Sequence, residues 1–250
     1  MIDTHCHLAH PDLIKNIDQI IQDAKKQMDA IITSIAPGDK EKSFEIYEKY
    51  KGFVYVSLGI HPIDVKEMTD KEIDQYKDFV LSHKNDIVAI GEIGLDYHWI
   101  KDKKTNERTK RVFIEFLDIA KQLNLPVILH LRKAAQEGFD IITNNDIKKA
   151  VFHCYAGNLT LAKEIIEQGY YISISTNLMG SKNTKKIAKK FPLENLLTET
   201  DAPFLSPFSG KPNVPQNVKF ILEKMSELRQ QPIEEIDKII VNNAKKIFKI

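Results

Sequence analysis

Short runs of aliphatic and β-branched residues alternate along the whole chain with longer charged segments of helical periodicity. Consecutive runs lie roughly 30 residues apart, the length of one βαβ unit. This alternation predicts parallel strands joined by crossover helices. The candidate strands are Ile2–His7, Ala30–Ile35, Val54–Ile60, Ile87–Glu92, Val127–His130, Val151–Cys154, Tyr171–Ser175 and Leu196–Thr200.

Eight such units in 250 residues match the size of a (β/α)8 barrel, the TIM barrel. We therefore predict an α/β fold in which residues 1–250 form a single TIM-barrel domain, because no linker or composition shift divides the chain. The main alternative is a doubly wound open sheet, which the same alternation can build. The positions of the polar residues favour the barrel.

Several helices carry their own start and stop signals. Thr69 is a candidate N-cap followed by acidic residues, and apolar residues recur at helical spacing after it. A second apolar stripe over 112–123 ends at Asn124, shortly before a proline. Asn217–Leu228 and a segment from Ile233 onward are predicted to close the fold.

The charge balance excludes a general attraction to one kind of partner. Lys and Arg total 36 and Asp and Glu total 35, so the net charge of +1 attracts neither nucleic acid nor membranes overall. No apolar run approaches the roughly 18 residues of a membrane helix, and the start of the chain lacks the pattern of a signal or transit peptide. We expect a cytoplasmic protein with no membrane association and reduced cysteines.

Polar residues stand where the predicted strands end. In a TIM barrel the carboxyl ends of the strands carry the active site. An apolar core gains nothing from six uncompensated polar groups, so we predict that these side chains bind metal. The candidate ligands are His5, His7, Glu92, His130, His153 and Asp201.

The period of two along a strand orients the residues around these ligands. It places His5 and His7 on one face and Cys6 on the other, with Asp3 on the histidine face. We expect Asp3 to accept a hydrogen bond from a ligand histidine, and Asp96 to lie in a loop or behind the ligands. The same alternation turns the thiol of Cys154 away from its neighbouring histidine, which argues against a Cys-His nucleophile.

Nitrogen and oxygen ligands suit divalent ions such as Mg, Mn or Zn. A catalytic ion uses about three protein ligands, so six side chains predict two ions, with Glu92 able to contact both. Two ions with a water molecule between them carry out hydrolysis. The sequence therefore predicts a metal-dependent hydrolase.

Six segments of the chain also resemble a known family, the TatD family of metal-dependent hydrolases and deoxyribonucleases. The resemblance runs from residue 2 to about 215, and six motifs in the right order are far more specific than a single His-x-His. The segments are Ile2-Asp3-Thr4-His5-Cys6-His7, Gly59-Ile60-His61-Pro62, Gly91-Glu92-Ile93-Gly94-Leu95-Asp96, Pro126-Val127-Ile128-Leu129-His130-Leu131-Arg132, His153-Cys154-Tyr155-Ala156-Gly157 and Glu199-Thr200-Asp201-Ala202-Pro203.

The resemblance implies an amidohydrolase-like barrel with two divalent ions. The first ion would be held by His5, His7, Glu92 and Asp201, and the second by Glu92, His130 and His153. Asp201 and Glu92 would be the catalytic residues, with Asp201 taking a proton from the attacking water. The implied activity is magnesium-dependent hydrolysis of DNA, as an exonuclease on single strands or 3′ ends, without an obligate protein partner.

The chain departs from the family pattern at three places. Ile63 stands where a second histidine often follows His-Pro, Thr109 stands where a glutamine is usual, and 211–215 lacks an arginine pair. None of these positions is a proposed ligand. The departures concern substrate preference rather than metal binding.

Candidate substrate contacts follow the predicted strands. We expect Tyr97–Arg111 to form a loop with a local charge of 6 − 2 = +4, and 181–190 to begin a helix with five lysines. Both would lie on the active-site side, although a lysine-rich solvated surface explains them equally well. The candidates are His61, Arg132, Trp99 and Lys182. Trp99 would stack on a base or anchor the loop, and Arg132 would clamp a phosphate or form a salt bridge at the rim.

Three functions are consistent with this pattern. The first is a deoxyribonuclease. The second keeps the ions but hydrolyses an ester, lactone, amide or aminoacyl bond, because the same activated water attacks a carbonyl carbon. The third is a non-catalytic barrel that binds nucleic acid or protein and uses metal for stability.

Overall fold

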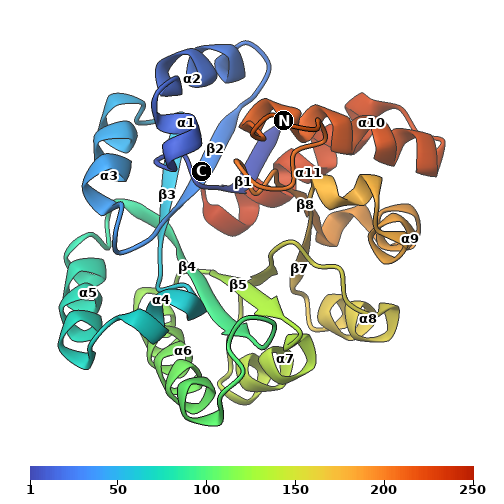
Figure 1. Cartoon of the computed structure of the whole chain (residues 1–250). Helices are drawn as coiled ribbons and strands as arrows, with labels where there is room; N and C mark the ends of the chain where they lie inside the picture. Colours follow the sequence, from blue (N-terminus) through green and yellow to red (C-terminus); the bar gives the residue numbers. More distant parts are fainter.

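A computed structural model describes all residues, 1–250, as a parallel eight-stranded sheet rolled into a barrel with helices outside it (Figure 1). Each strand pairs with the next along the chain. A doubly wound sheet would have a permuted strand order, so the TIM-barrel prediction is confirmed. The strands are β1 (Ile2–Cys6), β2 (Ala30–Ile35), β3 (Val54–Leu58), β4 (Ile87–Asp96), β5 (Val127–Arg132), β6 (Ala150–Phe152), β7 (Tyr171–Ile174) and β8 (Leu196–Thr198).

The helices cover the outside of the barrel and close its amino-terminal mouth. Short 3-10 turns lie at Thr176–Met179, Leu193–Asn195 and Pro215–Asn217. The α-helices are α1 (Pro11–Ile14), α2 (Ile17–Lys25), α3 (Lys40–Lys49), α4 (Pro62–Glu67), α5 (Asp70–Ser82), α6 (Lys103–Leu123), α7 (Ala135–Asn144), α8 (Leu159–Glu167), α9 (Lys182–Lys190), α10 (Val218–Arg229) and α11 (Ile233–Phe248).

The capping signals act where the sequence places them. Thr69 and Glu72 form a capping box: Glu72 N–H donates to Thr69 Oγ1 at 3.3 Å, and Thr69 N–H donates to Glu72 Oε2 at 2.7 Å. Helix α6 ends at Leu123, and its C-cap residue Asn124 has a left-handed φ of 53°. The prediction of a loop over 97–111 is wrong for residues 103–111. Asp102 is the N-cap of α6, and the helix already begins at Lys103.

Seven of the eight strands differ from their expected bounds by one to four residues, and the differences at β4 and β6 affect the site. Strand β4 continues past Glu92 to Asp96, because Ile93 and Leu95 remain buried and paired with β5. Strand β6 ends at Phe152, so Cys154 lies beyond the ladder with a left-handed φ of 47°. The alternation rule therefore does not apply to this cysteine.

The seam between β8 and β1 is joined by threonine hydroxyls. Thr4 Oγ1 donates to Thr198 O at 3.0 Å, and Thr198 Oγ1 donates to Ile2 O at 3.1 Å. Two backbone bonds continue the seam toward the carboxyl ends: Asp201 N–H donates to His5 O at 3.0 Å, and His7 N–H donates to Ala202 O at 2.7 Å. Closure thus brings residues near 5 and 201 into direct contact.

Helix α11 packs across the amino-terminal mouth of the barrel. Its residues Ala244, Ile247 and Phe248 form one buried cluster with the first residues of the strands, among them Ile2 and Ala30. This packing closes one end of the barrel with apolar side chains. The opposite mouth, at the carboxyl ends of the strands, is left for polar groups.

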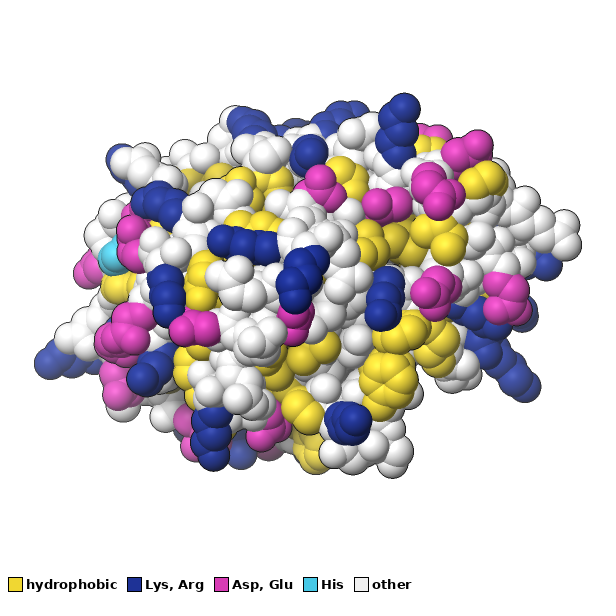
Figure 2. Space-filling model, turned by 90° about the horizontal axis from the view of Figure 1, so that it is seen from above, with side chains coloured by type: hydrophobic (Ala, Val, Ile, Leu, Met, Phe, Trp, Pro, Cys, Tyr) yellow, Lys and Arg dark blue, Asp and Glu magenta, His cyan; other side chains and the backbone are white.

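Basic and acidic side chains are interspersed on the face seen in Figure 2, so this face has no extended patch of a single charge sign. This agrees with the near-neutral net charge of +1. None of the helices has both the length and the hydropathy that crossing a bilayer requires.

The α11 cap gives a test of the fold. Replacing the buried Phe248 by alanine removes a ring from the cluster, and we expect this to lower the free energy of unfolding by about 3–5 kcal/mol. The exposed Lys238 on the same helix is the matched control, and K238A should change stability by less than about 0.5 kcal/mol. Guanidinium unfolding measures both variants. Equal midpoints for F248A and K238A would show that α11 does not stabilise the barrel.

Candidate metal centre

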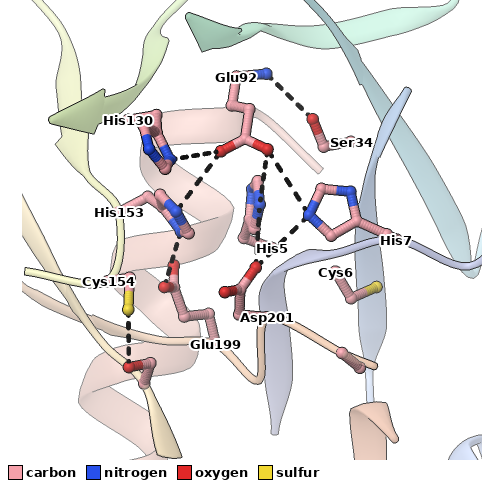
Figure 3. A network of polar contacts seen from close by, with 12 residues as sticks. His5, Cys6, His7, Ser34, Glu92, His130, His153, Cys154, Glu199 and Asp201 are labelled. Atoms are coloured by element: carbon pink, nitrogen blue, oxygen red, sulfur yellow. Dashed lines mark hydrogen bonds and ion pairs between the residues drawn. The ribbon is translucent and has the colours of Figure 1, made fainter. Parts of the chain in front are cut away.

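Glu92 lies at the centre of the polar residues at the carboxyl-terminal mouth (Figure 3). Its Oε1 is 3.8 Å from His5 Nε2 and 3.6 Å from His7 Nε2. Its Oε2 is 3.3 Å from His130 Nδ1 and 3.5 Å from His153 Nε2. The two oxygens of one carboxylate therefore face two separate pairs of imidazoles.

Asp201 completes the group on the side of β1. Its Oδ1 lies 3.6 Å from His5 Nε2 and 3.4 Å from His7 Nε2. The backbone bonds of the seam hold this position, and Asp201 itself has a left-handed φ of 57°. All six predicted ligands thus lie together, although they come from strand ends spread over almost 200 residues.

The donor atoms fit divalent cations. Both ring nitrogens of His5 are buried without any hydrogen-bond partner, and a buried polar atom of this kind is costly unless something binds it. Burial, followed by the charge of His153, lowers the pKa of His5 well below its usual value, so His5 is a neutral imidazole. Neutral imidazole is the form that binds metal.

The carboxylates supply the negative charge. Burial alone raises the pKa of Glu92, but the surrounding imidazoles outweigh it and hold this pKa well below the ordinary value. Burial also opposes protonation of His153, but the carboxylates, Glu199 first, raise its pKa to about 10. The negative charge of these carboxylates, which favours a proton on His153, also favours a metal cation at the same ring. Binding of the cation would release that proton.

Two further carboxylates orient the histidines from behind. His130 Nε2 lies 3.1 Å from Asp96 Oδ2, and His153 Nδ1 lies 2.9 Å from Glu199 Oε1. In each ring one nitrogen is held by a carboxylate while the other faces Glu92, an arrangement that metal-binding histidines commonly use. Burial raises the pKa of Asp96, but bonds from His130 and from backbone amides hold it at about 2, so it is ionised.

The predicted role of Asp3 is wrong. Its carboxylate accepts from Thr200 N–H at 2.9 Å, from Thr200 Oγ1 at 2.5 Å and from His5 N–H at 3.2 Å. It therefore binds backbone and a hydroxyl across the seam instead of an imidazole. Glu199, which the sequence reasoning missed, contacts the ring of His153 instead. Its place two residues before Asp201 could have indicated it.

The chain also brings β4 and β5 unusually close behind His130. Gly94 has a φ of +146°, and a Cβ at this position would lie 2.1 Å from the carbonyl oxygen of His130. Only glycine allows this approach. On the same strand, Glu92 N–H donates to Ser34 Oγ at 3.0 Å, which fixes the backbone that carries the central carboxylate.

His61 borders the centre on the β3 side. It is the N-cap of α4, and its Nδ1 accepts from Ile63 N–H at 3.2 Å, so the proton of the neutral ring is on Nε2. Burial lowers the pKa of His61 to about 4. The ring lies 4.2 Å from that of His130, centroid to centroid. His61 is thus a neutral donor beside the predicted ligands.

Three of the six cations in the expected basic loop are paired with carboxylates. Arg108 binds Asp70 and two backbone carbonyls, Arg111 binds Asp70, and Lys110 binds Glu137. Helices α5 and α7 supply these carboxylates. Lys101, Lys103 and Lys104 stay exposed without a carboxylate partner, so three of the six cations remain unpaired.

Other predicted contacts remain at the rim. Lys182 is exposed at the start of α9, which begins as expected. Arg132 forms no rim salt bridge, and its guanidinium carbon lies 5.7 Å from the centroid of the Trp99 ring. Trp99 is 61% exposed, so the packed-anchor alternative is wrong.

The two cysteines face different surroundings. Cys6 points away from the ligands, as expected, with Sγ 3.7 Å from Ile32 O (Figure 3). Cys154 lines a cavity of about 490 Å³ together with Arg132, His153 and Asp201, and its Sγ lies 3.2 Å from Ser175 Oγ, turned away from the His153 ring as expected (Figure 3). Burial raises the pKa of the Cys154 thiol well above its usual value, which leaves it protonated and unsuited to nucleophilic attack.

Comparison with known proteins gives consistent matches over the whole chain. The sequence profile of the TatD related DNase family matches residues 2–249. The uncharacterized metal-dependent hydrolase MJ1582 of Methanocaldococcus jannaschii is 39% identical over 249 residues, covering 99% of this chain and 96% of that protein. Human deoxyribonuclease TATDN3 is 31% identical over 258 residues, covering 99% of this chain and 94% of that protein. The crystal structure of YjjV, a TatD homologue from Escherichia coli, superimposes with a TM-score of 0.91 at 30% identity, covering 100% and 98% of the two chains.

The carboxylate behind His153 provides a test of the centre. Glu199→Gln keeps the shape of the side chain but removes its charge, so the ring of His153 loses the partner that orients it. We expect the affinity for Zn²⁺ to fall about 10- to 100-fold, measured by competition with a chromophoric chelator. Glu194→Gln, at an exposed position on the same segment, should bind like the wild type. Unchanged affinity in E199Q would contradict a role for Glu199 in metal binding.

Proposed function

The chain belongs to the TatD related DNase family of metal-dependent hydrolases, and from this premise we propose that it is a deoxyribonuclease using two divalent ions. The proposal rests on the position of the Glu92 carboxylate between two pairs of histidines. One oxygen of this buried carboxylate faces His5 and His7, and the other faces His130 and His153. A carboxylate between two sets of ligands suits a pair of ions.

Each proposed ion has its own ligands. His5, His7 and Asp201 lie on the Oε1 side of Glu92 and would hold the first. His130 and His153 lie on the Oε2 side and would hold the second. Bound there, divalent ions would polarise a phosphate and make a water molecule more acidic. Mg, Mn and Zn are all compatible with these nitrogen and oxygen donors.

Asp201 is the proposed proton acceptor. Its side chain is more open to the mouth than that of Glu92, at 17% against 9% exposure, and Glu92 is enclosed by four imidazoles. The attacking water loses its proton to the Asp201 carboxylate while its oxygen bonds to phosphorus; the ester P–O bond breaks, and the leaving oxygen takes up a proton from solvent. Glu92 is the second proposed catalytic residue, because its two oxygens would contact the two ions and fix their relative positions.

His61, Arg132 and Lys182 would bind the phosphodiester. The Nε2–H of His61 is a neutral donor at the edge of the centre, since Nδ1 is already used as an acceptor. Arg132 and Lys182 are exposed cations at the same mouth and would neutralise phosphates on either side. The name of human deoxyribonuclease TATDN3 supports DNA as the substrate, and cleavage from 3′ ends is the proposed mode.

One observation favours a second candidate. Because Arg108, Lys110 and Arg111 are paired with carboxylates, the mouth has fewer free cations than the sequence suggested. The same centre would then serve an ester, lactone, amide or aminoacyl substrate, which needs no extended phosphate-binding surface. Faster turnover of a panel of carbonyl substrates than of DNA would favour this candidate.

Replacing the proton acceptor tests the deoxyribonuclease proposal. Asp201→Asn should lower kcat for labelled single-stranded DNA by about 10²- to 10⁴-fold, because the water keeps its proton. His130→Ala serves as an inactive reference. If D201N retains metal and cleaves DNA at the wild-type rate, Asp201 is not the base. If the wild type itself cleaves nothing above H130A but binds DNA, a non-catalytic barrel is favoured.

Removing the metal tests the cofactor proposal. Chelation should abolish cleavage, and Mg, Mn or Zn added back in turn should restore it to different extents. The melting temperature should also rise on adding back a tightly bound ion, since ligands that bind only the folded state stabilise it. Full activity after exhaustive chelation would contradict a metal-dependent mechanism.

A further inference from the structure

Three large aromatic side chains are exposed, and two of them, Trp99 and Phe204, do not pack on another Phe, Tyr or Trp ring as Phe208 does on Phe220. Trp99 is 61% exposed and follows β4, and Phe204 is 50% exposed and follows β8. In a closed barrel of eight strands, strands four places apart lie across the axis from each other. Trp99 and Phe204 are therefore on opposite rims, with the metal centre between them.

The Trp99 rim is rigidly attached to the centre. Trp99 N–H and His98 N–H both donate to Asp96 Oδ1, at 2.9 and 2.8 Å, while the other oxygen of Asp96 contacts His130. The guanidinium of Arg132 lies 5.7 Å from the Trp99 ring centroid. An indole with an arginine at its face is a surface on which a nucleobase can stack.

The Phe204 rim is attached in an equivalent way. Phe204 N–H donates to Asp201 O at 2.8 Å, and its ring centroid lies 5.8 Å from that of His7 and 5.4 Å from that of His10. His10 is itself oriented as the N-cap of α1, with Nδ1 accepting from Asp12 N–H at 3.2 Å. Phe204 and His10 thus form a second, partly exposed aromatic surface beside the ligands.

We propose that these surfaces are two nucleobase platforms, Trp99 with Arg132 on one rim and Phe204 with His10 on the other. The substrate strand crosses the mouth with one base on each platform, which leaves the phosphate between them over the metal centre. This inference rests on the proposed nuclease function and deepens it. It also accounts for the large exposed rings, which contribute nothing to the apolar core.

The arrangement selects unpaired nucleotides. In a duplex, neighbouring bases stay stacked on each other and paired, so they cannot separate onto rings across a barrel mouth. Stacking contributes to binding without reading the sequence, because every base has an aromatic face. Stacking also contributes binding energy that Arg108, Lys110 and Arg111 of α6 do not supply to phosphates, because these cations are paired with carboxylates.

Trp99 is the only tryptophan of the chain, so its fluorescence reports directly on one platform. The wild-type protein is titrated with a short single-stranded oligodeoxynucleotide whose phosphorothioate linkages slow cleavage. We expect strong quenching, and much weaker quenching by the same oligonucleotide carrying abasic sites. The melting curve of each protein confirms that it is folded.

The second platform is tested with matched variants. Phe204→Ala should raise KM for single-stranded DNA roughly 5- to 140-fold, the loss of one stacked base, with a smaller effect on kcat. Phe204→Tyr keeps the ring and should behave like the wild type. Phe208→Ala is the control, because Phe208 is also exposed in the same loop but packs on Phe220, at 5.3 Å between centroids.

The outcomes separate the two proposals. If the wild type cleaves DNA but shows equal quenching by the abasic and normal strands, or if F204A keeps the wild-type KM, the platforms are refuted and the nuclease function stands. If the wild type neither cleaves nor binds oligonucleotides, both fail. Base-dependent quenching together with a raised KM in F204A and not in F208A supports two platforms.

Discussion

The buried carboxylate of Glu92 is the group on which the rest of the site depends. A charged side chain loses most of its hydration when it is 9% exposed, and such a loss is tolerated only where partners replace the water. Four imidazoles from three other strand regions do so. Because no short segment could supply them, the site requires the complete barrel. The fold and the centre are therefore coupled.

Closure of the barrel makes this coupling direct. The seam between β8 and β1 uses Thr4, Thr198 and Asp3, all buried, and its last backbone bonds lie at His5 and Asp201. Two of the predicted metal ligands, His5 and Asp201, are thus joined directly by the last hydrogen bonds that close the barrel. A cation that binds His5 and Asp201 would also hold the two ends of the sheet together, so ion binding and barrel stability should rise together.

Some of the charge on the outside of the barrel joins neighbouring helices. Arg108 joins α6 to Asp70 and to carbonyls near the end of α4, while Lys110 reaches Glu137 on α7. These contacts clamp neighbouring crossover helices. The mouth retains isolated cations and exposed aromatic rings, a combination that suits a ligand with both phosphates and flat bases.

The sequence by itself determined the strand alternation, the caps at Thr69 and Asn124, and the six polar residues at strand ends, because periodicity, capping and strand polarity are local properties. Only the tertiary structure decided that Glu199, and not Asp3, contacts a ring, and that Arg108 is paired with Asp70, 38 residues away. Side-chain partners of this kind depend on how strand ends leave the ladder and on which helices become neighbours. Which side chains become neighbours is decided by packing between segments far apart in the chain. A pattern read over a short stretch of sequence does not contain this information.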